Sequence, residues 1–413
     1  MNSPGCRNCK APLTSLFVDL GVSPLANRLL RESELLEPEP HLPLKAYVCD
    51  RCLLVQLPPY ASPDLLFTDY VYFSSFSSSF LEQCMRYADA ITDRLGLDRT
   101  SKIVEVASND GYLLRFFRDK GLDVLGIEPA ANVAEHASND GIPTITEFFG
   151  SRLAEALRDE YAADLLIGNN VLAHVPDLHD FVEGLGILLG PKGTITMEFP
   201  HILKLIEELQ FDTIYHEHFS YFSLAVVIDV FAQHDLTIFD VDEIPTHGGS
   251  LRIYARHAQE DLTPTNSVSD MLASEKAAGL NHLNTYLAFG ERVPSEKRTL
   301  LKMLIEMKER GQMISAYGAP AKGNTLLNYC GIGTDLIDFA VDTIPEKQGR
   351  YLPGSRIPVL HPNAIEERRP DVVFVLPWNL RQEIVPKLEG IGKWGGKILV
   401  RTPGFTIIAP SSS

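Results

Sequence analysis

The sequence predicts an α/β protein in which a small cysteine-containing module precedes two Rossmann-like domains. Its 413 residues suit two or three domains of ordinary size. Two Cys-x-x-Cys pairs stand near the N-terminus, and short β-branched runs alternate with helical stretches in two later parts of the chain. We therefore expect the module over residues 1–68, the first Rossmann-like domain over 69–260, a helical linker over 261–300 and the second Rossmann-like domain over 301–413.

The composition is that of an acidic globular protein. Hydrophobic residues make up 45% of the chain, which is enough to form buried cores, and the formal net charge is −17. Such a charge gives no general attraction for a phosphate backbone, so we expect no nucleic acid partner. The chain has no long apolar run of membrane-spanning length, and the N-terminal segment MNSPGCRNCK lacks the apolar centre of a signal peptide. We therefore expect a cytoplasmic protein without membrane contact.

Four of the six cysteines form two pairs, Cys6-x-x-Cys9 and Cys49-x-x-Cys52. In a reducing compartment such pairs favour a tetrahedral zinc site over disulfides. The gap between the pairs is longer than in a usual zinc ribbon, but the cost of closing a loop grows only slowly with its length. A site of four cysteines leaves no open position for catalysis, so we expect a structural Zn²⁺. The alternative is two redox-active or incidental cysteine pairs.

The elements that follow the module alternate between helix and strand. Residues 69–80 are rich in aromatic residues and serine, and apolar residues spaced three and four positions apart predict a helix over 77–96. Strands are expected at 102–106, 124–128, 142–148, 164–168 and 193–199, and helices at 111–121, 133–141 and 179–189. This alternation predicts a parallel, doubly wound sheet whose ligand lies at the carboxyl ends of the strands.

The loop after the first strand of this sheet, from Glu105 to Gly111, consists mostly of small residues. Such a loop lets a ligand approach the backbone and the start of the next helix, but it lacks the GxGxxG pattern of a standard NAD site. Glu128 ends the second strand and can accept hydrogen bonds from both hydroxyls of a ribose. Together the loop and the acid indicate an adenosine-type ligand, although Glu128 alone would also suit a solvated strand end.

This arrangement resembles the class I S-adenosylmethionine-dependent methyltransferases. Their glycine-rich loop corresponds to the segment EVASNDG, in which Ala107 and Asn109 stand where glycines are usual. Phe148 and Phe149 lie where the third strand ends, and they could form a wall for adenine or belong to the ordinary core. The residues that the resemblance implies for donor binding are Glu105, Ala107, Asn109, Asp110, Gly111, Glu128, Pro129, Phe148, Asn169 and Asn170.

A second cluster of reactive side chains lies at Tyr215-His216-Glu217-His218. A histidine such as His218 can remove a proton at neutral pH, and Glu217 or Tyr215 could orient its ring or stabilise developing charge. In a regular strand the two histidines would share one face and the other two residues the opposite face, so we expect a turn or a division of roles. The alternatives are an exposed polar strand edge and a zinc site formed by the two histidines.

The last part of the chain repeats the α/β pattern. A hairpin is expected around Gly248-Gly249, then a polar helical segment over 267–309, and then strands at 312–318, 335–342, 371–378 and 396–403. The loop GAPAKGN, which contains Lys322 and Asn324, opens a helix and is a candidate anion site, although it lacks the P-loop order. The alternative is a second Rossmann-like domain that serves only for packing.

A set of motifs spread over nearly the whole chain resembles the sugar C-methyltransferase family: the four cysteines, YHEHFSYFS, THGGSLR, AYGAPAKGNTLLNYCG and VDTIPEKQGR. The resemblance implies a dTDP- or GDP-linked 4-keto-6-deoxy sugar as substrate, S-adenosylmethionine as methyl donor, and a monomer or weak homodimer. It implies that His218 is the base, that Tyr215 and Glu217 are its neighbours, and that His174 is a second polar group facing the substrate. The substrate-binding residues that it implies are Tyr70, Tyr72, His247, Lys322 and Asn324.

The implied reaction is methylation of carbon through an enolate. A ketone makes the neighbouring C–H acidic enough for His218 to remove its proton, provided that the enolate oxygen is stabilised. The enolate carbon would then attack the sulfonium methyl group in line, a step that needs no metal. Three other functions remain open: methylation of oxygen or nitrogen in another small molecule, nicotinamide-dependent oxidoreduction, and a non-enzymatic zinc adaptor.

Overall fold

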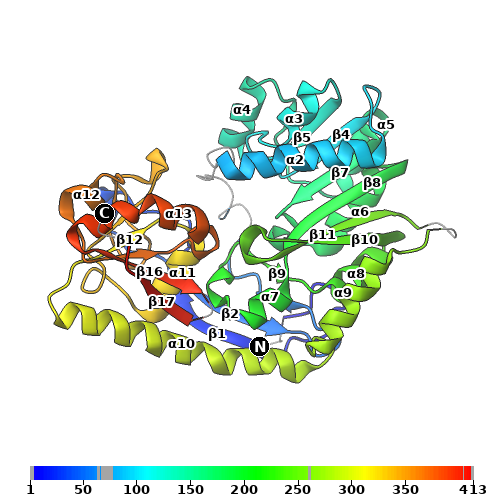
Figure 1. Cartoon of the computed structure of the whole chain (residues 1–413). Coiled ribbons are helices and arrows are strands. Elements are labelled where there is room, and N and C mark those ends of the chain that lie inside the picture. Colours follow the sequence, from blue (N-terminus) through cyan, green and yellow to red (C-terminus); the bar gives the residue numbers. More distant parts are fainter. Residues whose placement is uncertain (1–3, 63–65, 67–77, 259–261, 403, 411–413) are drawn as a thin grey trace. The chain divides into compact units, whose positions relative to one another are not determined.

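The structure is a computed structural model of the chain, and it describes residues 4–62, 66, 78–258, 262–402 and 404–410 (Figure 1). The chain folds into two compact units. Unit 1 comprises Met1–Thr14, Val48–Leu203 and Phe219–Leu283, and unit 2 comprises Ser15–Tyr47, Lys204–His218 and Asn284–Ser413. Both units are therefore built from segments that lie far apart in the sequence.

Unit 1 is built on a seven-stranded sheet with the strand order β10-β11-β8-β7-β4-β5-β6. The five strands from β8 to β6 are parallel, whereas β11 runs antiparallel to β8 and β10 antiparallel to β11. The strands are β4 (Lys102–Val106), β5 (Asp123–Ile127), β6 (Thr144–Ile145), β7 (Ala163–Asn169), β8 (Leu189–Pro200), β10 (Leu236–Ile244) and β11 (Ser250–His257). This doubly wound sheet and the hairpin formed by β10 and β11 confirm the predicted α/β architecture of this part of the chain.

Helices pack against this sheet, and one of them was not expected. The helix α5 fills the interval between β6 and β7, which the sequence analysis left without an element. The helices of unit 1 are α2 (Ser78–Leu95), α3 (Leu114–Asp119), α4 (Ala131–Asn139), α5 (Ser151–Tyr161), η3 (Leu172–His174), α6 (Leu178–Leu188), α8 (Leu224–Ala232), η5 (Thr246–Gly248) and α9 (Asn266–Ala277). The helix α2 buries Ala88 and Ile91 against Ile103 of β4 and Leu165 of β7, which holds it on the sheet.

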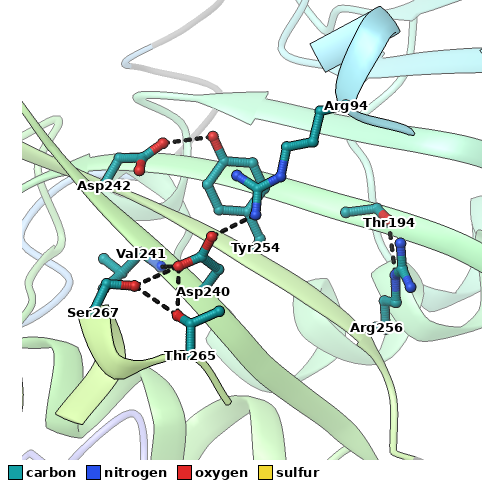
Figure 2. A network of polar contacts seen from close by, with 9 residues as sticks. All are labelled: Arg94, Thr194, Asp240, Val241, Asp242, Tyr254, Arg256, Thr265 and Ser267. Atoms are coloured by element: carbon teal, nitrogen blue, oxygen red, sulfur yellow. Dashed lines mark hydrogen bonds and ion pairs between the residues drawn. The ribbon is translucent and has the colours of Figure 1, made fainter. Parts of the chain in front are cut away.

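A network of polar contacts fixes the C-terminal end of α2 to the edge of the sheet (Figure 2). Arg94 of α2 forms an ion pair with Asp240 of β10, and its guanidinium lies 4.0 Å from the ring centre of Tyr254. Burial raises the pKa of Asp240, but hydrogen bonds from Ser267, Thr265 and Arg94 lower it to about 2. The carboxylate is therefore charged at neutral pH, and it joins α2, β10 and the start of α9.

Two further strands of unit 1 are short. β3 (Val55–Gln56) pairs antiparallel with β9 (Ser220–Tyr221), in the register Val55 to Tyr221. The chain that follows the second cysteine pair thus lies beside the segment that follows His218 in sequence.

Unit 2 contains the second Rossmann-like sheet, with the strand order β14-β13-β12-β15-β16-β17. Adjacent strands in this sheet run parallel, except that β17 runs antiparallel to β16. The strands are β12 (Ile314–Tyr317), β13 (Phe339–Val341), β14 (Val359–Leu360), β15 (Val372–Val375), β16 (Lys397–Thr402) and β17 (Gly404–Ile408). The four strands expected from the sequence in this part of the chain are thus confirmed, and the short strand β14 and the antiparallel strand β17 are added.

The other elements of unit 2 surround this sheet or precede it in the chain. β1 (Ser15–Ser23) and β2 (Leu42–Val48) are sheet neighbours, and α7 (Ile202–Glu207) leads into the segment 204–218. The remaining helices are η1 (Glu32–Glu34), η4 (Phe211–Thr213), α10 (Leu283–Glu309), α11 (Ala321–Cys330), η6 (Pro345–Lys347), α12 (Ala364–Arg368), η7 (Trp378–Leu380), α13 (Arg381–Lys387) and η8 (Glu389–Trp394). The polar segment expected as one helical stretch over 267–309 is divided between α9 and α10.

No helix in the described part of the chain combines the length and the apolar character that crossing a membrane requires.

Candidate functional site

The two cysteine pairs form matched backbone knuckles in unit 1. In the first, the N–H of Cys6 donates to Ala11 and the N–H of Lys10 donates to the carbonyl of Cys6. The second repeats both bonds from Cys49 to Leu54 and from Leu53 to Cys49. The fourth residue after the first cysteine of each pair has positive φ, 61° at Lys10 and 62° at Leu53. Each pair is therefore folded in the same way, with both thiols on the inside of a tight turn.

The four thiols converge on one point. Their Sγ atoms all lie within 4.8 Å of one another, with 3.5 Å between Cys6 and Cys52 and 3.4 Å between Cys9 and Cys49. A tetrahedral zinc centre with Zn–S bonds of about 2.3 Å has sulfur atoms about 3.8 Å apart. The amide of Gln56 also donates to Cys6 Sγ, a contact of the kind that supports a bound thiolate. These residues fit one structural Zn²⁺. Four cysteine ligands would fill its tetrahedral shell, so no position would remain for a substrate or a catalytic water.

A pocket opens in unit 1 where the carboxyl ends of β4, β5 and β7 meet. The strand order reverses between β4 and β7, which is the position at which doubly wound sheets bind their ligands. The predicted site residues that line the pocket are Ala107, Asn109, Glu128, Pro129, Phe148, Asn169, Asn170, His174 and His247. The helix α2 contributes Phe80, Cys84 and Tyr87 to the lining.

The loop after β4 has a backbone that usually requires glycine. Ala107 has a φ of 56°, Asn109 of 49° and Gly111 of 73°. Asparagine tolerates this left-handed region better than most residues, and alanine adopts it only under strain. At Gly111 a β-carbon would also lie 2.8 Å from the side chain of Ile142. The departures from the usual glycine pattern therefore preserve the glycine-like conformation of the loop.

Glu128 connects this loop to the next strand. One carboxylate oxygen accepts the N–H of Asn109 at 3.0 Å, and the other accepts the N–H of Ala130 at 2.9 Å. Burial raises the pKa of Glu128, and these two backbone donors partly offset that effect. Because a carboxylate offers about four acceptor positions, Glu128 keeps capacity for the hydroxyl groups of a ligand in the pocket.

Two other acidic residues predicted for donor binding lie beneath the pocket. Glu105 and Asp110 have fully buried side chains and are absent from the pocket lining. Burial raises the pKa of Glu105 well above its usual range, although a hydrogen bond with Tyr112 acts in the opposite direction. Glu105 is therefore held in its neutral form, and the acidic side chains that line the pocket itself are Glu128, Glu147 and Glu198.

The aromatic and histidine side chains of the pocket differ in exposure. Phe148 is 49% exposed, so it is not a core residue, whereas Phe149 packs edge-on against Phe181 with 5.4 Å between the ring centres. Burial, together with the nearby His247, lowers the pKa of His174 to about 4. His174 is therefore neutral at physiological pH, with one ring nitrogen that donates a hydrogen bond and one that accepts.

The reactive cluster Tyr215–His218 belongs to unit 2. His218 Nδ1 lies 2.9 Å from the carbonyl oxygen of Thr213, and His216 Nε2 lies 3.1 Å from that of Pro43. Glu217 accepts two hydrogen bonds from the amide of Asn27, both at 2.8 Å, and burial raises its pKa to about 7. The segment is thus a turn rather than a regular strand, and His216, Glu217 and His218 each have a different partner.

The candidate anion loop of unit 2 is closed by an internal carboxylate. Asp342 accepts the N–H groups of Ala319 and Ile344 at 2.7 and 2.9 Å, which repeats the pattern of Glu128 in unit 1. Lys322 donates to Asn379 at 3.0 Å, and burial lowers its pKa to about 8. The Asn324 amide donates to the carbonyl of Ala26. Tyr70 and Tyr72 lie outside the described residues.

Comparison with known proteins decides the family. The chain is 35% identical over 412 residues to the C-methyltransferase NovU of Streptomyces niveus, which covers 99% of this chain and 97% of that protein. The chain belongs to the C-methyltransferase family. Models of a zinc binding domain, a methyltransferase domain and a C-methyltransferase C-terminal domain match residues 6–67, 80–241 and 245–403.

Solved structures resemble parts of the chain at low sequence identity. The PH0226 protein of Pyrococcus horikoshii is 14% identical with a TM-score of 0.37, over 45% of this chain and 95% of that protein. An S-adenosylmethionine-dependent methyltransferase of Clostridium acetobutylicum is 8% identical with a TM-score of 0.36, over 43% of this chain and 92% of that protein.

Membership of this family establishes the enzyme as an S-adenosylmethionine-dependent C-methyltransferase with a zinc-binding domain. The pocket of unit 1 fits the donor, because it combines an apolar rim, an acid at the end of β5 and a loop that exposes its backbone. The sulfonium ion of the donor is cationic, which suits a pocket whose lining includes Glu128, Glu147 and Glu198.

Sequence reasoning missed a polar group on the wall of this pocket. Arg252 of β11 donates to Glu198 at 2.8 Å, and its guanidinium lies 4.2 Å from the ring centre of Tyr87. Tyr87 in turn bonds Thr196 at 2.6 Å. Two signals were present: Arg252 ends the motif THGGSLR, and it alternates with apolar residues in the strand SLRIYARH, but neither by itself separates a pocket residue from an edge residue.

Proposed function

We propose that this C-methyltransferase acts on a nucleotide-linked 4-keto-6-deoxy sugar, with dTDP or GDP as the nucleotide. Carbon methylation requires loss of a proton from carbon, and a ketone lowers the barrier to that loss by stabilising the resulting anion. The proposal is supported by the family and by the motifs that resemble the sugar C-methyltransferases. Methylation of oxygen or nitrogen would not need a base strong enough to remove a carbon-bound proton.

The observation that carries the proposal is the hydrogen bond between His218 and Thr213. A carbonyl oxygen only accepts, so the 2.9 Å contact requires that Nδ1 of His218 carries the proton. The lone pair is then on Nε2, which makes that nitrogen the basic atom of the ring. We propose that His218 Nε2 removes the proton from the carbon next to the ketone.

Two groups of the same turn, Tyr215 and Glu217, support this role. The rings of Tyr215 and His218 lie 4.0 Å apart, so the phenol packs against the proposed base. Glu217, whose pKa is about 7, changes protonation near the working pH, and His174 is neutral there. We propose that Tyr215 or His174 donates a hydrogen bond to the enolate oxygen, and that Glu217 adjusts the charge near the base.

The donor would be held in the pocket of unit 1, where it supplies an electrophilic methyl group. We propose that Glu128 binds its ribose, that Phe148 covers its adenine, and that Asn109, Asn169 and Asn170 bound the remainder. For the sugar nucleotide we propose Tyr70, Tyr72, His247, Lys322 and Asn324.

Hydrogen exchange tests the proposal apart from methyl transfer. The sugar nucleotide would be incubated in D₂O with S-adenosylhomocysteine in place of the donor, and loss of the α-hydrogen would be followed by mass spectrometry or NMR. We expect exchange with the wild-type enzyme and a loss of about 10²- to 10⁴-fold in His218→Ala, with donor affinity unchanged. Exchange at the wild-type rate in the variant would transfer the role of base to Tyr215 or His174.

A further inference from the structure

A buried ion pair in unit 2 holds the segment that leads to His218. Arg401 of β16 donates to Asp212 of η4 at 2.7 Å, and the two residues are 3% and 0% exposed. The second oxygen of the Asp212 carboxylate accepts the indole N–H of Trp378 at 2.7 Å. Arg401 also donates to the carbonyl oxygen of Leu209. Arg401 of β16 and Trp378 of η7, both in the C-terminal domain, thus hold residues 209–212 through three hydrogen bonds.

Residues 209–212 end one residue before Thr213, whose carbonyl oxygen fixes the tautomer of His218. Thr213 follows Asp212 directly, and its N–H and hydroxyl both bond the carbonyl of Gln210, at 3.1 and 2.7 Å. Its own carbonyl oxygen then accepts from His218 Nδ1. The N–H of His218 bonds the carbonyl of Tyr215 at 2.9 Å, which closes the turn. A displacement of η4 would therefore move the acceptor that fixes the His218 tautomer.

The ion pair between Arg401 and Asp212 is better suited to orient residues 209–212 than to stabilise the folded chain. A buried ion pair usually contributes little net stability, because the cost of removing two charges from water offsets their attraction. The planar guanidinium of Arg401 contacts Asp212 and the Leu209 carbonyl together, and it also faces the ring of Phe211 with 5.1 Å between guanidinium and ring centre. A lysine could not form this set of directed bonds.

We propose that Arg401, acting through Asp212, is a positioning residue for His218, so that the C-terminal domain sets the tautomer and orientation of the base. The inference rests on the proposed function for its kinetic consequence, but its structural consequence stands apart from it. Arg401 does not itself contact the reacting atoms in this scheme.

The direct test is the tautomer of His218 by NMR of the full chain with isotopically labelled histidine. The His218 signals would be assigned by comparison with His218→Ala. We expect the wild type to populate the Nδ1-protonated form, and Arg401→Lys and Trp378→Phe to shift the ring toward a mixture. Trp378→Phe keeps the ion pair and an aromatic ring beside Arg401 and Lys322 but removes the indole bond to Asp212, so it remains informative if Arg401→Lys does not fold.

The kinetic test is the same α-hydrogen exchange, expressed per folded molecule. We expect Arg401→Lys to slow exchange by about 10- to 100-fold, since small displacements of a catalytic group have effects of this size, with the donor dissociation constant unchanged. Lys308→Met is the control, because it breaks a more exposed ion pair of the same unit, with Asp338 at 2.9 Å, whose two residues lie outside the segment 204–218. It should lower stability but leave both the exchange rate and the tautomer unchanged.

The possible results separate the two proposals. An unchanged His218 tautomer in folded Arg401→Lys and Trp378→Phe would overturn the positioning role, whatever the rates. An equal loss of exchange in Lys308→Met would also overturn it, because the effect would then be general destabilisation. If His218→Ala exchanges normally, the assignment of the base fails, while the tautomer shift still decides whether Arg401 orients the ring.

Discussion

The guanidinium of Arg7 donates to the carbonyl oxygen of Phe219 at 2.9 Å, so the first zinc knuckle holds the residue that follows His218 in the chain. A second bond from Arg7 reaches the carbonyl of Pro176 at 3.1 Å, two residues after His174. The N–H of Phe219 itself donates to Ala173, the residue before His174. The zinc-binding domain therefore fixes the backbone beside two of the proposed catalytic residues.

Replacing Arg7 should separate this role from zinc binding. Burial lowers the pKa of Arg7 to about 10, so it remains charged at neutral pH and its two hydrogen bonds are charge-assisted. We expect Arg7→Gln to reduce turnover while zinc content and donor affinity stay near the wild-type values. Elemental analysis, calorimetry and initial rates would measure the three quantities. Arg51→Gln, at the exposed arginine of the other knuckle, should leave all three unchanged. Loss of zinc from Arg7→Gln would instead show that Arg7 is needed to keep the first knuckle folded around the metal.

The cysteine cluster predicts one Zn²⁺ per chain that is coupled to local folding. Cys49→Ser should release the metal, because a structural zinc site with three thiolates is much weaker. Limited proteolysis should then cut within residues 6–57, while residues 80–257 resist. Cys330→Ser provides the control, since that buried thiol lies in unit 2. A full complement of zinc in Cys49→Ser would exclude this residue from the ligand set.

Much of the fold could be predicted because its signals are local. The β-branched run 102–106 coincides with β4, and the double cysteine pairs indicated the metal before any geometry was known. The loop of unit 1 was harder to read, because Ala107 and Asn109 adopt a glycine-like backbone that the residue types alone do not indicate. Helix α5 was not predicted although its apolar spacing is helical, with Leu153 and Leu157 four positions apart.

The partners of the site could not be predicted because they depend on tertiary packing. Arg252 reaches the pocket through the pairing of β11 with β8, which places it opposite Glu198. Asn27 reaches Glu217 across 190 positions in the sequence. Neither contact has a local pattern, so only the three-dimensional arrangement shows which acid is paired and which cation lines the pocket.

Glu217 predicts a pH dependence of stability. Its pKa in the folded chain is about 7 against an ordinary value of 4.5, so the folded state binds its proton more tightly than the unfolded state. The corresponding stability is fully present below about pH 4.5 and is lost as the pH rises toward 7. The slope is at most about 1.4 kcal/mol per pH unit. Glu217→Gln cannot titrate, so denaturant unfolding across this range should show a shallower decline for the variant. Parallel curves for the two proteins would contradict the raised pKa.

Glu128 predicts the strength of donor binding. If Glu128 holds the ribose hydroxyls, Glu128→Ala should weaken the binding of S-adenosylmethionine by about 1.5–3 kcal/mol, as expected for hydrogen bonds to a charged group. Calorimetry with adenine, which has no ribose, provides the comparison. Adenine should bind the variant as it binds the wild type unless the loss of the bonds to Asn109 and Ala130 has rearranged the loop. An unaltered affinity for S-adenosylmethionine would refute the assignment.

Arg252 is the only lysine or arginine among the described residues that line the pocket of unit 1. Its Nε is buried and has no hydrogen-bond partner in the described part of the chain, while its Nη2 bonds Glu198. A cation with a spare donor in an otherwise acidic pocket matches the one carboxylate of S-adenosylmethionine.

We therefore expect Arg252→Gln to weaken binding of S-adenosylmethionine by about 1.5–3 kcal/mol, because a charge-assisted hydrogen bond is lost. The discriminating ligand is 5′-methylthioadenosine, which keeps the adenosine and the sulfur but lacks the amino acid portion. Its affinity, measured by the same calorimetry, should be the same in the wild type and the variant. Arg252→Lys keeps the charge without the directed bonds, so its affinity for S-adenosylmethionine should lie between those of the wild type and Arg252→Gln. Equal losses for both ligands would show that Arg252 serves to neutralise Glu198 and to hold Tyr87, and that the donor carboxylate is bound elsewhere.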